Sequence, residues 1–391
     1  MWYDGLCPLP WWGVALVALG FTHLTCVAVT VYLHRHQAHR ALALHPLLAH
    51  AFRAWLWLTT GMRTREWIAV HRRHHARVET PEDPHSPWAF GIRRVLFEGA
   101  ELYQAAARDP ELVARYGQGA PDDFLECSVY RHDRTGVGLM LVADVVLFGP
   151  EGLALWAVQM IWIPVFAAGI INGLAHWRGY RNFDTADAST NLTPWGILIA
   201  GEELHNNHHA YAGSARFSAK PWEFDIGWAY IRLFALCRLA RIRKLAPCLC
   251  IAAPKPALDG ETLRALVRGR LHVMSDYAER VVRRVHREET RKADAATRRD
   301  LKAVRRVLLR ADRRVDEGAR ERLAAVLGDC APLAVVHHFQ ERLRGIFAER
   351  AATQERLLAL FQEWCRQAEQ TGVAALADFA RRLRGYSLTG P

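Results

Sequence analysis

Long apolar runs in the first part of the chain predict helices of membrane-spanning length. Residues 11–33 contain no acidic residue, lysine or arginine, and about 20 residues of that kind cross the hydrocarbon core of a bilayer. Two further apolar runs, residues 135–152 and 153–175, adjoin each other, and Asp144 lies inside the first of them. We therefore predict one span over 11–33 and a helical hairpin whose arms, 135–152 and 153–175, enter and leave the membrane.

A fourth apolar stretch, residues 41–62, is predicted to stay outside the bilayer core. It contains His45, His50 and Arg53, and ionisable side chains are costly at that depth. We expect a helix that lies in the plane of the membrane interface or is buried in protein.

The distribution of positive charge orients these segments. The residues before position 11 include Asp4 but no lysine or arginine, whereas residues 34–40 contain two arginines and three histidines. Because short basic segments remain in the cytoplasm, we expect a periplasmic N-terminus and place residues 34–40 in the cytoplasm.

The last third of the chain has a different composition. The protein has 391 residues and a net charge of +11, and residues 258–391, with 27 Lys+Arg and 19 Asp+Glu, carry +8 of that charge. Apolar residues recur there at spacings of three and four, which is typical of helices. We predict a membrane domain over 1–257 and a soluble, Arg-rich helical extension over 258–391 in the cytoplasm. Such an extension is either a solvated bundle or a site for a membrane surface or an acidic partner.

The eight cysteines exclude several classes of metal and redox site. They include no CxxC pair, which argues against a zinc ribbon, a thioredoxin motif and an iron–sulfur site. No disulfide framework is indicated, so a reducing compartment fits best.

Three dense clusters contain many of the 19 histidines. They are HRHQAH at 34–39, HRRHH at 71–75 and HNNHH at 205–209, and NGLAH at 172–176 adds one more histidine. In the second and third clusters the histidines stand at i, i+3 and i+4, on one face of a helix. Neutral imidazole is a ligand for zinc, iron, copper and nickel, and this many imidazoles exceed the needs of one four-coordinate zinc. They suit two metals, and two redox metals at one site indicate oxygen chemistry or electron storage.

All the clusters must meet on one side of the membrane to form one site. An even number of crossings must therefore separate each pair of clusters. Residues 41–62 have room for only one crossing, so they should not span. The hairpin over 135–175 supplies the two crossings needed before the fourth motif.

Together the motifs resemble those of the integral-membrane acyl desaturases of the stearoyl-CoA desaturase type. The resemblance rests on HRHQAHR at 34–40, HRRHH at 71–75, NGLAH at 172–176 and GEELHNNHH at 201–209. It implies an all-α fold, a membrane-embedded helical enzyme whose cytoplasmic helical cap holds a di-iron site. It also implies a bacterial inner-membrane location, with the active site and the C-terminus in the cytoplasm.

The resemblance also assigns the metal ligands. It implies that the ligands are His34, His39, His71, His74, His75, His176, His205, His208 and His209, with Asn172 binding one iron through a water. His36 and Asn206 would not bind metal themselves but would orient these ligands through hydrogen bonds. No catalytic residue is expected beyond the metal ligands.

The activity implied is O2-dependent insertion of a cis double bond, at carbon 9, into a saturated acyl chain carried by CoA or phospholipid. The cofactors would be two iron ions, with O2 as co-substrate. Electrons would come from a separate ferredoxin or cytochrome b5-like donor with its reductase, because the extension lacks the His-Pro-Gly-Gly motif of a fused cytochrome b5. No nucleic-acid partner is expected, although residues 355–385 resemble helices of some transposases.

Two alternatives use the same histidines. A di-iron hydroxylase would share the oxidant but place oxygen on the alkyl or acyl chain, and a non-catalytic membrane protein would only bind or transport metal. The contexts GEELHNNHH and NGLAH favour desaturation over hydroxylation. Transporters usually place polar ligands inside their spans, whereas these clusters flank them.

Overall fold

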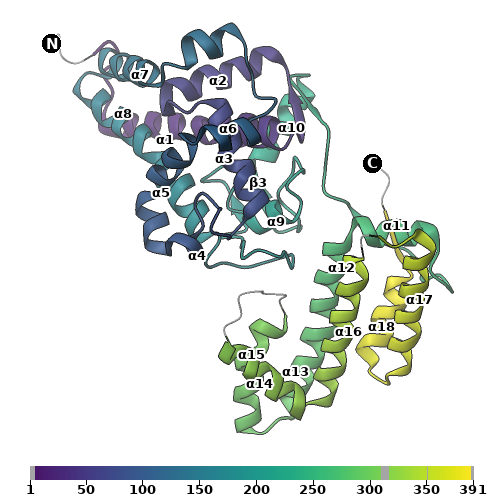
Figure 1. The fold of residues 1–391 in the computed structure, drawn as a ribbon. Helices are drawn as coiled ribbons and strands as arrows, with labels where there is room; N and C mark the ends of the chain where they lie inside the picture. Colours follow the sequence, from purple (N-terminus) through teal and green to yellow (C-terminus); the bar gives the residue numbers. More distant parts are fainter. Residues whose placement is uncertain (1–4, 310–316, 350, 389–391) are drawn as a thin grey trace. The chain divides into compact units, whose positions relative to one another are not determined.

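The computed structural model describes residues 5–309, 317–349 and 351–388 (Figure 1). Helices dominate, as predicted, and the sheets in the described part of the chain are three two-stranded pairs that were not predicted. The first four residues, at the N-terminus predicted to be periplasmic, lie outside the described ranges. The chain forms two compact units. The first unit comprises Met1–Asn182 and Asp187–Ala246, and the second comprises Phe183–Ala186 and Pro247–Pro391.

Two helices of the first unit are long and apolar enough to cross a membrane. One is α1 (Trp11–Ala28), which continues into the π-helix η1 (Val29–Ala38), and the other is α8 (Pro150–Ile163), which continues into the π-helix η3 (Pro164–Leu174). They have 28 and 25 residues respectively. Both coincide with predicted spans, and α1 exposes large apolar side chains such as Trp11 and Leu16.

The predicted hairpin forms, but its first arm is short. Helix α7 (Asp133–Phe148) has 16 residues, fewer than the ~20 that cross a bilayer core. The side-chain amide of Gln159 in α8 donates to the buried Asp144 carboxylate at 2.8 Å. At Gly152 a Cβ would collide with the Asp144 carbonyl, so this glycine allows the two arms to approach.

Helix α2 (Pro46–Thr60) occupies most of the stretch predicted to lie at the interface. It begins later than expected, because Leu42–Leu44 forms strand β1, which pairs antiparallel with β4 (Ala240–Ile242). Arg53 is buried in α2 and donates to both carboxylate oxygens of Asp123, at 2.9 and 3.0 Å. The ion pair accounts for a buried arginine in an apolar helix, and the interfacial placement of α2 stays a prediction.

Shorter elements of the first unit surround the histidine-bearing segments. Helix α3 (Thr64–Arg77) carries the second cluster and packs against α6 (Pro110–Tyr116), and α9 (His205–Ala210) carries the third. The remaining elements are α4 (Pro87–Phe90), α5 (Ile92–Ala107), η2 (Glu126–Tyr130), α10 (Ile226–Leu236) and the parallel pair β2 (Trp195–Gly196) and β3 (Phe224–Asp225). Buried apolar residues of α1, η1 and α2 form the main core of this unit.

The second unit is a helical bundle with its own apolar core. Trp364, Phe361, Leu343 and Tyr277 are among its fully buried side chains. Its helices are α11 (Gly260–Arg268), α12 (Arg270–Tyr277), η4 (Ala278–Val282), α13 (Arg283–Lys292), α14 (Ala295–Leu308), α15 (Glu317–Asp329), α16 (Ala331–Ala348), α17 (Gln354–Gln370) and α18 (Ala374–Leu383). Strands β5 (Leu249–Ile251) and β6 (Tyr386–Leu388) pair antiparallel. The predicted helical extension thus begins with a strand, ahead of residue 258.

Candidate metal centre

The nine predicted histidine ligands converge in two adjacent groups. They come from the end of η1, from α3, from the residues after η3 and from α9. One group, the first histidine group, is His34, His39, His71, His75 and His208, and the second histidine group is His74, His176, His205 and His209. Within each group, one nitrogen of each ring lies within 4.8 Å of the corresponding nitrogen of every other ring.

The Nε2 atoms point at one another inside each group. In the first, Nε2 of His34 lies 3.0 Å from Nε2 of His208, and that of His39 lies 2.8 Å from that of His71. In the second, Nε2 of His205 lies 2.9 Å from Nε2 of His176. Lone pairs directed at one point in this way create a site for a cation.

Each HxxHH motif divides its ligands between the groups. His71 and His75 of α3 face the first group, and His74 faces the second. In α9 the division is reversed, since His208 belongs to the first group and the two flanking histidines to the second. Spacing alone placed each motif on one helical face. The structure shows that this face lies between the two histidine groups and contributes side chains to both.

Carboxylates hold the outer nitrogen of several rings. The Nδ1 atoms of His34, His74 and His209 lie 2.7 Å from Glu202, 2.9 Å from Asp83 and 3.1 Å from Asp187 respectively. Glu202 also accepts from the Thr30 hydroxyl at 2.6 Å. A carboxylate at Nδ1 keeps the proton there, so the Nε2 lone pair faces inward, and such partners orient metal-binding histidines.

Burial keeps most of these rings neutral. It lowers the pKa of His71, His75, His205 and His208 well below the usual range, and neighbouring histidines lower it further. Burial also lowers the pKa of His209 to about 4, even though Asp187 opposes the shift. Neutral imidazole is the form that binds a metal.

The carboxylates are ionised in spite of burial. Burial alone would raise the pKa of Asp83, Asp187 and Glu202, but the histidine facing each one holds that pKa below its usual range. The set therefore combines nine imidazoles with buried negative charge behind them. This fits two first-row transition metals such as iron, with five protein nitrogens for one and four for the other.

The other three predicted site residues have different surroundings. Asn172 precedes His176 by about one turn, on η3, and lines a cavity together with His205. His36 belongs to neither group, and its Nδ1 lies 3.1 Å from the Leu42 carbonyl oxygen. Asn206 donates to the Ser189 hydroxyl at 3.4 Å, and that hydroxyl donates to Asp187 at 2.5 Å. Hydrogen bonds thus link Asn206 through Ser189 to Asp187, the carboxylate that faces His209.

Sequence reasoning missed the role of several residues. Asp83 and His85 lie in the segment after the second cluster, and His85 is buried with its ring 4.4 Å from that of His74. Asp187 gave no signal in the sequence. Glu79 lies 3.5 Å from Nδ1 of His176. These carboxylates come close to the Nδ1 atoms of the histidines only in the folded chain.

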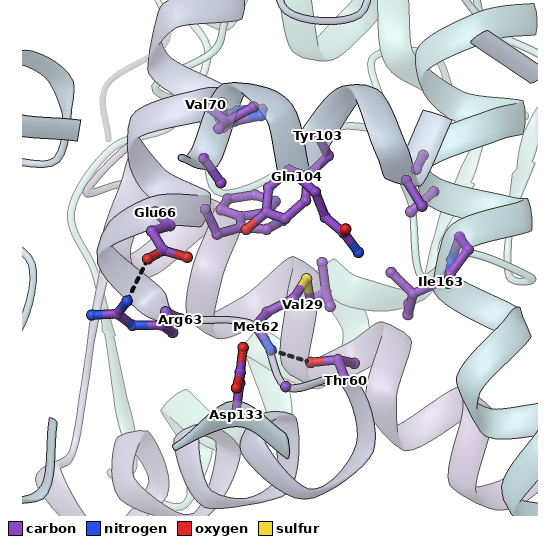
Figure 2. Close-up of a pocket in the computed structure, with 18 of the residues that line it drawn as sticks. Val29, Thr60, Met62, Arg63, Glu66, Val70, Tyr103, Gln104, Asp133 and Ile163 are labelled. Atoms are coloured by element: carbon purple, nitrogen blue, oxygen red, sulfur yellow. Dashed lines mark hydrogen bonds and ion pairs between the residues drawn. The ribbon is translucent and has the colours of Figure 1, made fainter. Parts of the chain in front are cut away.

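A cavity of about 1040 Å³ reaches the metal centre. Figure 2 shows Val29, Met62 and Ile163 facing it, with the Arg63–Glu66 ion pair and Asp133 at one side. The cavity is also lined by His34, His71, His74, His85 and His205. An apolar space with polar groups at one side and metal ligands at another suits a long apolar substrate with a polar end.

Comparison with known proteins identifies two regions. Residues 9–223 match the fatty acid desaturase family. Residues 265–388, which account for less than half of the chain, match a transposase family. The first match contains all nine histidines of the two groups, and the second lies outside them.

Named desaturases are similar to this chain over more than half of its length. The Delta-9 acyl-lipid desaturase 1 of Arabidopsis thaliana is 30% identical over 239 residues, which cover 60% of this chain and 76% of that protein. The sn-1 stearoyl-lipid 9-desaturase of Synechocystis sp. is 30% identical over 245 residues, 61% of this chain and 73% of that protein. A probable lipid desaturase of Arabidopsis thaliana, ADS3.2, is 31% identical, and the chain spans 60% of its length.

The family match covers more than half of the chain and coincides with the unit that holds the histidine groups and the cavity. The chain therefore belongs to the fatty acid desaturase family of oxidoreductases.

Proposed function

We propose that the protein is an O2-dependent di-iron desaturase that places a cis double bond, at carbon 9, in a saturated acyl chain. The overall reaction removes two hydrogens from adjacent methylenes. With two electrons from a donor and two protons from solvent, O2 is reduced to two waters. The observation that carries this proposal is the convergence of nine histidines in two groups, four of which, His34, His71, His74 and His205, line one largely apolar cavity.

The residues have separable tasks in this reaction. A pair of bound iron ions would supply the activation of O2. The histidine groups would bind these ions, Asn172 would contribute through a water, and Glu202, Asp83 and Asp187 would keep a proton on the Nδ1 atoms. The cavity would hold the acyl chain in one register and exclude bulk water, so that only one pair of methylenes lies near the metals.

The carrier of the acyl chain is proposed to be a membrane lipid. Relatives named acyl-lipid and stearoyl-lipid desaturases support this choice, although another is named an acyl-CoA 5-desaturase. A chain already esterified in a bilayer could enter the cavity sideways from the lipid. The Arg63–Glu66 pair and Asp133 are then placed to meet its polar ester region.

The proposed setting is a bacterial inner membrane, with the metal centre on the cytoplasmic side. The two long apolar helices and the family support membrane association. The histidines of η1 and those after η3 stand at the ends of these helices, where a site at the cytoplasmic surface requires them. A separate ferredoxin or cytochrome b5-like protein would supply the electrons.

The experiment that tests this function offers both carriers to the purified, iron-loaded protein. Stearoyl-CoA and a stearoyl phospholipid in vesicles are supplied separately, each with O2 and reduced ferredoxin. We expect an oleoyl product from the phospholipid. Product from stearoyl-CoA alone would reject the lipid carrier, and no unsaturated product from either would reject the function.

A further inference from the structure

A second pocket lies beside the metal centre and is strongly basic. It has a volume of about 380 Å³ and is lined by Ala38, Arg40, Arg72, Arg115, Tyr116 and Gln118. Three of these six residues are arginines, and none is acidic. Within the described part of the chain, no carboxylate lies at ion-pair distance from any of the three guanidinium groups. The pocket thus concentrates positive charge that the protein does not neutralise.

Two more cations extend this surface. The backbone amides of Arg243 and Lys244 donate to the Ala41 carbonyl, at 2.9 and 3.0 Å. This fixes them beside the residues that follow His39. Arg40, Arg115, Arg243 and Lys244 are exposed to solvent, and Arg72 is half-buried. We call these five residues the basic surface.

The basic surface borders the first histidine group. Arg40 directly follows His39, and Arg72 directly follows His71. The charges of Arg72 and Lys244 act on the His39 ring. Three of the five histidines in the first group are only partly buried, against one of the four in the second. Two of the five residues of the basic surface are thus adjacent in sequence to ligands of the first group.

The hydrogen bonds of the Arg72 guanidinium indicate what kind of anionic partner would bind. Its guanidinium donates to the carbonyl oxygens of Gln37, Ala38, Tyr116 and Gln118, at distances from 2.7 to 3.0 Å. A site built to hold a phosphate would leave a guanidinium fork free for two parallel hydrogen bonds. Arg72 instead contributes a fixed charge, and Arg40 and Arg115 remain available at the rim. This arrangement suits attraction of an acidic protein surface more than capture of a single phosphate.

We propose that the basic surface docks the electron donor, and that the donor is a small acidic one-electron carrier protein. The inference rests on the proposed function, which requires two electrons from outside for each double bond. Each reduced carrier would be oxidised by one electron, so two carriers would dock in turn for each O2 reduced to water. Complementary charge would speed this encounter and make it depend on salt.

The test reverses charge on the rim and leaves Arg72 in place. The double variant Arg40→Glu, Arg115→Glu is compared with Arg93→Glu, Arg94→Glu, which makes the same change in net charge on the exposed face of α5. Binding of a [2Fe–2S] ferredoxin to the iron-loaded protein is measured at low and high salt. Reduction of the bound iron is followed with ferredoxin and, separately, with dithionite.

We expect the rim variant to bind ferredoxin about 10-fold or more weakly at low salt, and the difference to shrink at high salt because charges are then screened. Iron content and reduction by dithionite should match the wild type, and the α5 variant should bind ferredoxin normally. Equal ferredoxin affinity for both variants would overturn the proposal. So would a rim variant that retains ferredoxin binding but loses binding to phosphatidylglycerol vesicles, since the surface would then be a lipid site.

Lys244→Glu is a second variant, in case the change beside His39 displaces iron. It should weaken ferredoxin binding in the same direction, and an unchanged affinity in this variant would also count against the proposal. Binding is read without any need for product. A failure of the desaturase function would appear in product analysis, whereas a failure of docking would appear in ferredoxin affinity.

Discussion

The two units bury very different kinds of side chain. In the described part of the second unit no Asp, Glu, Lys or Arg is buried, and its interior consists of residues such as Trp364 and Phe361. Its many charges lie on helix surfaces, often paired along one helix, as in Arg284 with Glu288 of α13. The first unit buries acidic residues, arginines and histidines together.

The difference in buried side chains indicates that the first unit holds the reactive site. Burial of an unpaired charge costs several kcal/mol, so a fold keeps buried ionisable groups where they are paired or have a function. The second unit is stabilised in the ordinary way, by an apolar core. The first unit gives up part of that stability to hold nine imidazoles and their carboxylates in place.

The largest expected effect comes from removing a ligand of the first histidine group. His208→Ala should abolish unsaturated product and reduce bound iron, because it deletes one of five converging nitrogens. Iron is measured by mass spectrometry of the purified protein and product by lipid analysis. The control is His132→Ala, an exposed histidine outside both groups. Normal iron content and activity in His208→Ala would rule out the assignment of this ligand.

A carboxylate behind a ring should matter less than the ring itself. Glu202→Gln keeps the size of the side chain but removes the charge that faces His34, and we expect metal affinity to fall about 10–100-fold. Competition with a chelator measures that affinity. The matched change Glu101→Gln, on an exposed position of α5, should leave it unaltered. Equal affinities in the two variants would show that Glu202 has no part in orienting the site.

In the metal-free protein, a fall in pH should lower the folding stability of the first unit before that of the second. Because the pKa values of His71, His75, His205 and His208 are lowered, the unfolded chain gains protons below about pH 6.5 that the folded chain does not. Stability is therefore lost as the pH falls below that value. The carboxylates Asp83, Asp187 and Glu202, with lowered pKa values, lose their contribution only at still lower pH.

Hydrogen exchange at about pH 7.5 and about pH 5.5, corrected for intrinsic rates, tests this order. Segments α3 and α9 should lose protection at the lower pH, whereas α17 and α18 should change little. Loss of protection in α17 and α18 first would contradict the comparison between the units.

The smallest effect on bound iron should come from a core change in the second unit. Trp364 is fully buried and donates to the Phe339 carbonyl at 3.0 Å. Trp364→Ala should destabilise that unit by about 3–5 kcal/mol and leave iron content unchanged, while Trp364→Phe should cost less. Unfolding of the second unit is followed by hydrogen exchange of the backbone amides in α17, and bound iron is measured in the same protein. Loss of iron in Trp364→Ala would show that the units are not independent in this respect.

The sequence predicted the identity of the converging histidines better than their arrangement. The i, i+3, i+4 spacing places His71, His74 and His75 on one helical face, because that follows from the geometry of a single helix. Their division between two groups depends on where α9 and η1 lie, and no local pattern reports that. The π-helical turns of η1 and η3 also shift the direction of the side chains near His34 and His176 relative to a regular helix.

The supporting carboxylates were harder to predict for the same reason. Glu202 stands 168 positions from His34, and Asp187 stands 22 positions from His209. His36 was expected to support the ligands because it lies between two of them in the sequence, and that role stays a prediction. In the structure its Nδ1 faces the Leu42 carbonyl. Strand β1 likewise depends on a tertiary contact, its pairing with β4, that an apolar run does not reveal.

The most direct test of the account is lipid analysis of a host that expresses the chain and has no desaturase of its own. Fatty acids are released and analysed by mass spectrometry, and iron is measured in the same purified protein. The account predicts two irons per chain and a new cis double bond at carbon 9, with the double bond absent and the iron content reduced in His208→Ala. A hydroxylated chain, or no new fatty acid from a protein that carries two irons, would contradict it.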